Sequence, residues 1–185
     1  MLALARQKLA AYRPGLETEE TSVNSSSIQG SSSAVAFVQH DFLASPDVPP
    51  TIPTPVSAMI CTLVLEHFPL APFFASFRNL LPVGGLALVT NMHSEMGLKG
   101  QAGFVSEQVD EQGRPVKIRG DSWPHTVEET VQAAEDAGFE IVALGGQGKI
   151  RERHVKEDMI EKLGDRAKKW VGVNVWYGFA VKRVQ

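Results

Sequence analysis

The sequence predicts an α/β fold built on an open, mostly parallel β-sheet with an antiparallel last strand. Apolar runs of strand length alternate along the chain with amphipathic helical patterns. Residues 56–90 follow the order strand, helix, strand, at about the length of a βαβ unit. The first of these strands, 56–64, is apolar on both faces, which is typical of a parallel strand covered by helices on both sides.

Composition narrows the class of protein. The formal net charge is −3 and the Lys and Arg residues are scattered, which argues against a nucleic-acid-binding protein. The longest apolar stretch is too short for a membrane-spanning helix. Cys61 is the only cysteine, so no disulfide can form within this sequence, which favours a reducing compartment. We therefore expect a cytoplasmic protein that binds neither nucleic acid nor a membrane.

The N-terminal third contains a helix, a strand and two loops. Apolar residues spaced three and four apart predict a helix over 1–12, which Pro14 and Gly15 end. A polar, serine-rich loop is expected over 19–33, and a short apolar strand over 34–38. The proline-rich segment that follows is expected to form a second loop.

The middle of the chain carries the strand–helix–strand unit and a hairpin. Strand 56–64 leads into an amphipathic helix over 70–81, whose apolar residues recur with helical spacing. Strand 86–90 follows Gly84 and Gly85. Residues 104–118 are expected to form an inserted hairpin, because two short strand-like runs flank a polar turn that contains glycine.

The C-terminal third is predicted to alternate helices and strands. Thr126 and Glu129 have the spacing of a capping box, which predicts that a helix begins there. A strand is expected over 139–144 and a long closing strand over 171–181. Residues 151–169 are expected to be helical, with the inward-facing residues Val155, Met159, Ile160 and Leu163.

Polar residues follow three of the predicted strands. Open parallel sheets bind ligands beyond the carboxyl ends of their strands. Topology alone therefore selects three segments as the candidate binding edge: 40–42, 62–67 and 91–93.

Several stretches in the same order resemble motifs of the Rossmann-like, class I S-adenosylmethionine-dependent methyltransferases, in particular the branch that acts on small molecules. Two of them resemble the motif after that family's fourth strand and its fifth strand, and another resembles the end of its third strand. The resemblance covers nearly the whole chain. The stretches are Met1–Lys8, Gln39–Phe42, Ile60–His67, Leu80–Thr90, and Trp123–Thr126 with Ala137–Glu140.

The resemblance implies a cofactor, a reaction and a set of site residues. The cofactor would be S-adenosyl-L-methionine, and the reaction would be methyl transfer to a small-molecule acceptor. Asp41 would contact the adenine amino group. The other cofactor-binding residues expected are Phe42, Thr62, Leu63 and His67.

Three histidines are candidates for the catalytic residue that removes the acceptor's proton, because histidine titrates near neutrality. They are His67, His93 and His125. His93 and His125 could instead be surface or helix-entry histidines, and His67 could belong to a polar loop that satisfies nearby backbone groups. Asp41 could simply cap a turn. No metal is expected, because these histidines lack the HxH or HExxH spacing of a zinc site.

The sequence departs from the family pattern at its start. The family's glycine-rich turn after strand 1 and the acidic residue that ends strand 2 would both lie before Met1. We therefore expect one partial methyltransferase domain over 1–185, N-terminally incomplete, with the first two strands absent. Strands 34–38 and 56–64 would then lie about 14 Å apart, at roughly 4.8 Å per neighbouring strand.

The resulting unpaired sheet edges could be resolved in three ways. Strand 34–38 could pair directly with strand 56–64, another chain could fill the gap, or the sequence could be an incomplete product of a longer gene. Association through the exposed edges is the partner interaction expected besides the small-molecule acceptor. A non-catalytic methyltransferase remnant that acts as a binding module is the main functional alternative. A dinucleotide-binding oxidoreductase is disfavoured because the sequence has no GxGxxG motif.

Overall fold

The computed structural model describes residues 7–8, 11, 18–19, 35–36, 40–42, 44, 55–100, 103–119, 122–143 and 148–185. The chain divides into two units, Met1–Pro53 and Thr54–Gln185, and each is considered by itself.

The unit Met1–Pro53 contains two short strands. Strand β1 (Thr18–Glu19) pairs in parallel with β2 (Val35–Ala36). Strand β2 confirms the core of the strand expected over 34–38. Strand β1 was not predicted, and it takes up the first residue of the expected serine-rich loop. Gln7, Lys8 and Ala11 are helical, and the rest of the helix predicted over 1–12 lies outside the described residues.

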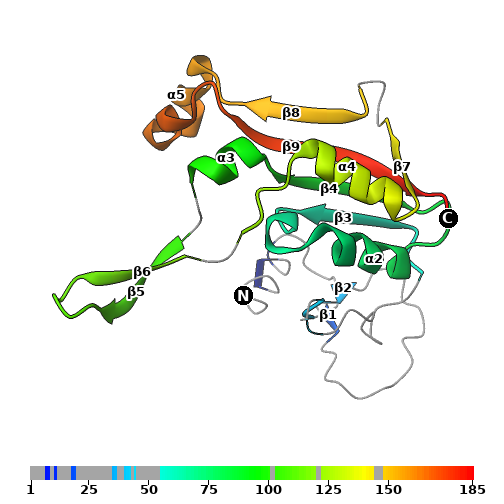
Figure 1. Cartoon of the computed structure of the whole chain (residues 1–185), viewed down its shortest axis with the longest axis horizontal. Coiled ribbons are helices and arrows are strands. Elements are labelled where there is room, and N and C mark those ends of the chain that lie inside the picture. The colour runs from blue at the N-terminus through cyan, green and yellow to red at the C-terminus, as the bar shows by residue number, and fades with distance from the viewer. Residues whose placement is uncertain are drawn as a thin grey trace. The chain divides into compact units, whose positions relative to one another are not determined.

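The unit Thr54–Gln185 is built on a five-stranded sheet (Figure 1). Its main order is β3-β4-β9-β7, and β8 also pairs with β9. The strands are β3 (Ala58–Thr62), β4 (Leu86–Met92), β7 (Phe139–Val142), β8 (Ile150–His154) and β9 (Asn174–Arg183). Strand β3 runs parallel to β4, and β9 runs antiparallel to β4, β7 and β8. The predicted α/β class with an antiparallel last strand is therefore confirmed.

Two helices pack on one face of this sheet. Helix α2 (Leu70–Leu80) connects β3 to β4, as expected for a βαβ unit. Helix α4 (Val127–Asp136) begins at the predicted capping box, in which Glu129 N donates to Thr126 Oγ1 over 3.1 Å. The core between these two helices and the sheet contains every second residue of the strands, because successive side chains of a strand point to opposite faces of the sheet. Its buried members include Phe73, Phe74, Phe77, Ala87, Val89, Ala134, Phe139, Ile141, Phe179 and Val181.

The opposite face of the sheet and the β3 edge differ from expectation. Strand β3 was predicted to be covered on both faces, yet Ile60 is 75% exposed and Leu86, on β4, is 42% exposed. Within the described part of Thr54–Gln185, β3 is hydrogen-bonded to β4 on one side only. Among the described residues of this unit, the apolar strand thus lies at an edge of the sheet.

The prediction of one helix over 151–169 is wrong. Residues 151–154 belong to strand β8. Strand β7 pairs only with the last four residues of β9, so the backbone groups of the first half of β9 can pair with β8. The remainder forms η2 (Glu157–Met159), α5 (Ile160–Leu163) and η3 (Asp165–Trp170). Gly164, with φ 81°, separates α5 from η3. Val155 is buried as predicted, whereas Met159 and Leu163 are exposed by 37% and 54%.

The expected hairpin is present as β5 (Gly103–Val109) and β6 (Pro115–Arg119). Asp110 organises its turn, since its Oδ1 accepts hydrogen bonds from the backbone of Gln112 and Arg114, each over 2.9 Å. Such side-chain acceptance is the usual way in which aspartate stabilises a turn.

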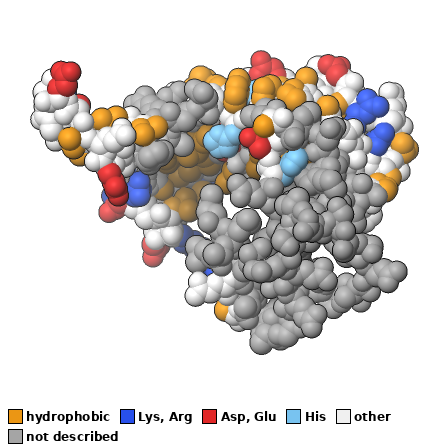
Figure 2. Space-filling model, turned by 90° about the horizontal axis from the view of Figure 1, so that it is seen from below, with side chains coloured by type: hydrophobic (Ala, Val, Ile, Leu, Met, Phe, Trp, Pro, Cys, Tyr) orange, Lys and Arg blue, Asp and Glu red, His pale blue; other side chains and the backbone are white. Residues whose placement is uncertain are grey.

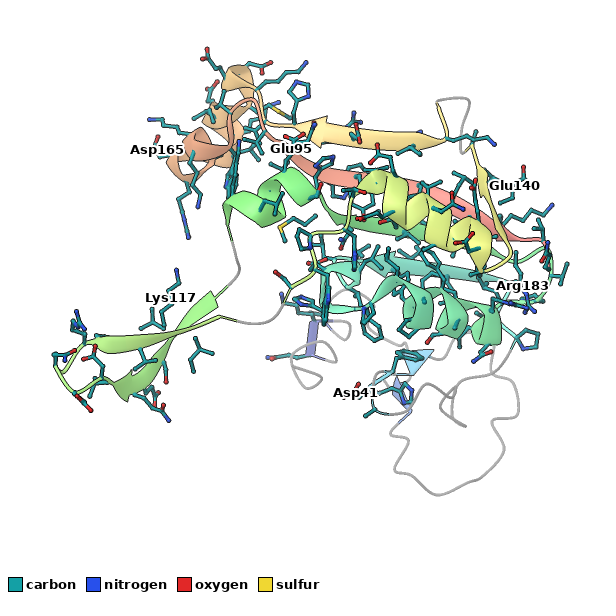
Figure 3. The ribbon with its side chains drawn as sticks, viewed as in Figure 1. Asp41, Glu95, Lys117, Glu140, Asp165 and Arg183 are labelled. Atoms are coloured by element: carbon teal, nitrogen blue, oxygen red, sulfur yellow. The ribbon has the colours of Figure 1, made fainter. Side chains whose placement is uncertain are left out.

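Two ionisable side chains fasten helix ends to the sheet (Figure 3). Arg183, on β9, donates to the carbonyl oxygen of Arg78 over 2.6 Å at the end of α2. Glu95 belongs to α3 (Ser94–Lys99), a helix that was not predicted, and accepts from Asn174 Nδ2 over 2.8 Å. Hydrogen bonds from Asn174 hold the pKa of Glu95 below its usual value.

In the part of the chain that the structure describes, no helix has the length and apolar character needed to cross a membrane.

Candidate functional site

The carboxyl ends of β3 and β4 lie side by side. Thr62 pairs with Thr90 in the parallel ladder, and the next amide, Leu63 N, donates to Thr90 O over 2.9 Å. Leu63 has φ 54°, the left-handed conformation that is uncommon for residues other than glycine. This conformation ends β3 sharply and turns the chain into η1 (Leu65–His67). Each of the three segments predicted to form the binding edge follows the tip, or carboxyl end, of a strand. The tips of β3 and β4, which precede two of these segments, therefore meet at one edge of the sheet.

A distant segment, 122–126, packs against η1 through two hydrogen bonds. Trp123 N donates to Glu66 O over 2.8 Å, and His125 Nε2 lies 2.7 Å from Phe68 O. Because a carbonyl oxygen can only accept, His125 Nε2 must carry the proton of this bond. In the neutral ring, Nδ1 of His125 is then the nitrogen with a lone pair. The fold thus brings His125 to Phe68, the residue that follows His67 in the chain.

His93 is used structurally. It is the N-cap of α3, and its Nδ1 accepts from Glu95 N over 3.2 Å. Its Nε2 lies 3.5 Å from Glu152 Oε1, and the side chain is only 10% exposed. The lone pair of the neutral ring is therefore occupied by the helix cap, which leaves Nε2 as a proton donor toward Glu152. This geometry favours the helix-entry alternative for His93.

His67 and Glu66 differ in exposure although they are adjacent. The side chain of His67 is 56% exposed, whereas that of Glu66 is 12% exposed, and their nearest charged atoms are 3.9 Å apart. Glu66 Oε2 is buried and has no hydrogen-bond partner among the described residues. His67 is thus accessible to a ligand at this edge. Figure 2 shows histidine, acidic and hydrophobic side chains together on one face of the molecule.

A buried polar cluster behind this edge was not predicted. The Tyr177 hydroxyl lies 3.1 Å from Thr130 Oγ1, which itself donates to Thr126 O over 2.7 Å. Since the Thr130 hydroxyl has one proton, Tyr177 must be the donor to Thr130. Burial raises the pKa of Tyr177, a hydrogen bond with Asn91 opposes the rise, and the charge of Glu66 adds to it.

Asn91 completes this cluster. It is 1% exposed, faces Tyr177 across the β4–β9 ladder, and its Oδ1 has no partner among the described residues. Its signal in the sequence is the alternation of Ala87, Val89 and Asn91, which puts a polar residue on the core face of β4.

Cys61 lies on β3, one residue before the tip. Burial raises the pKa of its thiol from 9.0 to about 11, and the negative charge of Glu66 contributes to the same rise. A thiol with such a pKa is almost entirely protonated at neutral pH. Cys61 is therefore an inert thiol rather than a nucleophile.

The third predicted tip belongs to the other unit, Met1–Pro53. Asp41 Oδ1 accepts from Ala44 N over 3.1 Å, so Asp41 caps a turn, the alternative to its expected adenine contact. Phe42 is half-buried, with its ring 4.4 Å from that of His40 in an edge-to-face arrangement.

The strand order and directions define a class of protein. A parallel β3–α2–β4 unit followed by an antiparallel strand between β4 and β7 is the C-terminal half of the class I S-adenosylmethionine-dependent methyltransferase sheet. The chain has the fold of these methyltransferases, and the resemblance found in its sequence is confirmed by comparison with known proteins.

A protein of Emericella nidulans, named as an uncharacterized methyltransferase, is 52% identical over 124 residues. The match covers 67% of this chain and 42% of that protein, so the chain spans less than half the length of its curated relative. No protein-family model matches the chain.

Two solved structures share the fold. A methyltransferase from Mesorhizobium loti is 14% identical with a TM-score of 0.52, and the match covers 84% of this chain and 72% of that one. A methyltransferase from Methanosarcina mazei is 13% identical, also with a TM-score of 0.52, over 99% of this chain and 78% of that one. Both are described as dependent on S-adenosylmethionine.

The residues at the tip of β3 fit the adenosyl part of that cofactor. Leu63 and Val64 are 55% and 38% exposed, and together they offer an apolar surface of the kind that binds a neutral ring. His67 beside them supplies a polar group, the usual complement of an apolar ligand site.

Proposed function

We propose that this chain forms the acceptor-side half of an S-adenosylmethionine-dependent methyltransferase that methylates a small molecule. The observation that carries this proposal is the gathering of His67, Trp123 and His125 beside the paired tips of β3 and β4, through the hydrogen bonds of Glu66 and Phe68. The methyltransferase fold and the 52% identical relative support the same reading.

When bound, S-adenosylmethionine would supply an electrophilic methyl group, whose bond to sulfur breaks as the acceptor's nucleophilic atom bonds to carbon. The protein's contribution is to align the acceptor and exclude water. His125 is placed to take the acceptor's proton on Nδ1, because its Nε2 is fixed by Phe68 O at 2.7 Å. Trp123, 39% exposed, would form an apolar wall for the acceptor.

The cofactor contacts belong to the same proposal. Thr62, Leu63 and His67 would hold the adenosyl group at the β3 tip. For Asp41 and Phe42, which belong to the unit Met1–Pro53, adenine contact remains what the family resemblance implies. A cytoplasmic location is proposed with them, supported by the lone cysteine.

Calorimetric titration with S-adenosylhomocysteine tests this proposal. We expect micromolar binding, weakened severalfold by Leu63→Asn, because asparagine tolerates a positive φ yet removes the apolar contact. Leu98→Asn, on α3, is the matched control, since Leu98 is 76% exposed and should not affect binding. Absence of binding up to millimolar ligand would overturn the proposal.

The edge of β3 favours a second candidate function, that of a binding module. Strand β3 is hydrogen-bonded on one side within the described part of its unit, and Ile60 is 75% exposed on it. Such edges pair readily with strands of other chains. The partner would be a complete homologue, such as the Emericella nidulans protein. Sedimentation of the two proteins together would show a complex that Ile60→Lys abolishes and Leu98→Lys preserves, whereas independent sedimentation would exclude this function.

A further inference from the structure

A hollow of about 220 Å³ lies on the sheet face opposite α2 and α4. Leu88, Val142 and Ala180 contribute to its lining from three different strands, β4, β7 and β9. These side chains belong to the positions that alternate with the core residues Val89, Ile141 and others. The hollow therefore has an apolar floor, and it is separated from the buried polar cluster by the thickness of the sheet.

The indole of Trp176 forms a wall of this hollow. Trp176 and Gly178 both line it, two residues apart on the same face of β9. A Cβ atom at Gly178 would lie 2.8 Å from Cη2 of Trp176 and 3.2 Å from Cγ2 of Thr90. The indole ring can therefore lie over the strand only because residue 178 has no side chain. This arrangement presents an aromatic surface to whatever enters the hollow.

Two cationic residues complete the lining. Lys149 and Arg151 come from the β7–β8 connection and from β8. Lys149 is exposed and Arg151 is half-buried. A cationic rim beside an apolar floor selects ligands that have an apolar body and a negative charge at one end.

We propose that this hollow binds a small aromatic carboxylate, sulfonate or similar flat anion. The ring would lie on Leu88 and Ala180 against the indole of Trp176, and the anionic group would face Lys149. The volume of about 220 Å³ is smaller than the roughly 300–1,000 Å³ of sites for drug-sized ligands, so one or two rings fill it. The site is argued separately from the proposed methyl transfer, because Thr90 is the single described lining residue that also belongs to the β3–β4 edge.

A pair of fluorescent probes tests this proposal on the full chain. We use 8-anilinonaphthalene-1-sulfonate and its uncharged analogue N-phenyl-1-naphthylamine, which share the rings and differ in the anionic group. We expect one saturable site for the sulfonate, with energy transfer from tryptophan that Trp176→Phe reduces while Trp123 and Trp170 remain as donors. Lys149→Ala should weaken the sulfonate about two- to fivefold, the range for an exposed ion pair, and leave the neutral probe unchanged.

Matched variants separate this site from general surface binding. Lys168→Ala is the charge control, because Lys168 pairs with Asp165 over 2.8 Å outside the hollow. Gly178→Ala should weaken both probes by displacing Trp176, with circular dichroism confirming that the variant is folded. Equal loss for Lys149→Ala and Lys168→Ala, or equal affinity for the charged and neutral probes, would overturn the proposal. Saturating S-adenosylhomocysteine should leave probe binding unchanged, and competition between the two would place the probe at the β3–β4 edge instead.

Discussion

Alkylation of Cys61 tests the local geometry at the tip of β3. Burial, and next the charge of Glu66, raise the thiol pKa from 9.0 to about 11. Two pKa units lower the thiolate fraction near neutral pH by about 100-fold. A more basic thiolate is intrinsically more nucleophilic, which recovers roughly six- to tenfold at a Brønsted coefficient of about 0.4–0.5. The net expectation is alkylation about tenfold slower than that of an unperturbed thiol, before any steric protection is counted.

The measurement is simple because the chain has one cysteine. Iodoacetamide incorporation, followed by intact mass, is compared in buffer and in concentrated guanidinium chloride. The pH dependence separates ionisation from steric protection: in the folded protein the rate should keep rising above pH 9 and level off near the pKa of about 11. Levelling near pH 9 in the folded protein would refute the reasoning.

Glu66→Gln sharpens this test. It removes the second cause of the raised pKa and retains the shape of the side chain, so alkylation at fixed pH should become faster. Glu128→Gln, at an exposed position on α4, is the matched control and should not change the rate. An unchanged rate in Glu66→Gln would mean that the carboxylate does not act on the thiol, and would remove Glu66 from the surroundings that control Cys61.

The same pKa shift has a consequence for stability. The folded protein favours the neutral thiol more strongly than the unfolded chain does, so above pH 9 the unfolded chain binds fewer protons. The free energy of unfolding should therefore be unaffected by Cys61 below pH 9 and should fall as the pH rises from 9 toward about 11. Cys61→Ser, whose hydroxyl does not ionise in this range, should reduce that fall in urea titrations.

Three further substitutions test the packing, each by urea denaturation. Tyr177→Phe removes the hydrogen bond to Thr130 and should cost about 1–2 kcal/mol, whereas no change would mean that this buried bond contributes nothing net. Phe74→Ala deletes a ring that is 0% exposed and should cost about 3–5 kcal/mol, so a loss below about 1 kcal/mol would contradict its central place in the core. Thr126→Ala removes the cap that accepts from Glu129 N and should cost about 1 kcal/mol, with the helical circular dichroism signal reporting any fraying of α4.

Much of the fold follows from local signals. Helix α2 could be predicted because Phe73 and Phe77 recur on one helical face. Helix α4 could be predicted because the side chains of Thr126 and Glu129 accept hydrogen bonds from each other's backbone amides, which marks the start of a helix. Strand β8 could not be predicted. Its sequence, Ile150–His154, is charged and has no strand alternation, and it becomes a strand only because the first half of β9 offers free backbone groups.

The candidate site shows the same division between local and long-range information. Strand ends single out His67 and His93, but only the folded chain shows that the Nδ1 of His93 is used to cap α3. The approach of His125 to Phe68 joins residues 57 positions apart, and no spacing rule encodes it. Asn91 is the opposite case: a polar residue in alternation with buried apolar ones needs a buried partner, and the residue facing it on the closing strand is Tyr177. The buried cluster therefore does have a signal in the sequence, namely a polar residue on the core face of a strand and close to its carboxyl end.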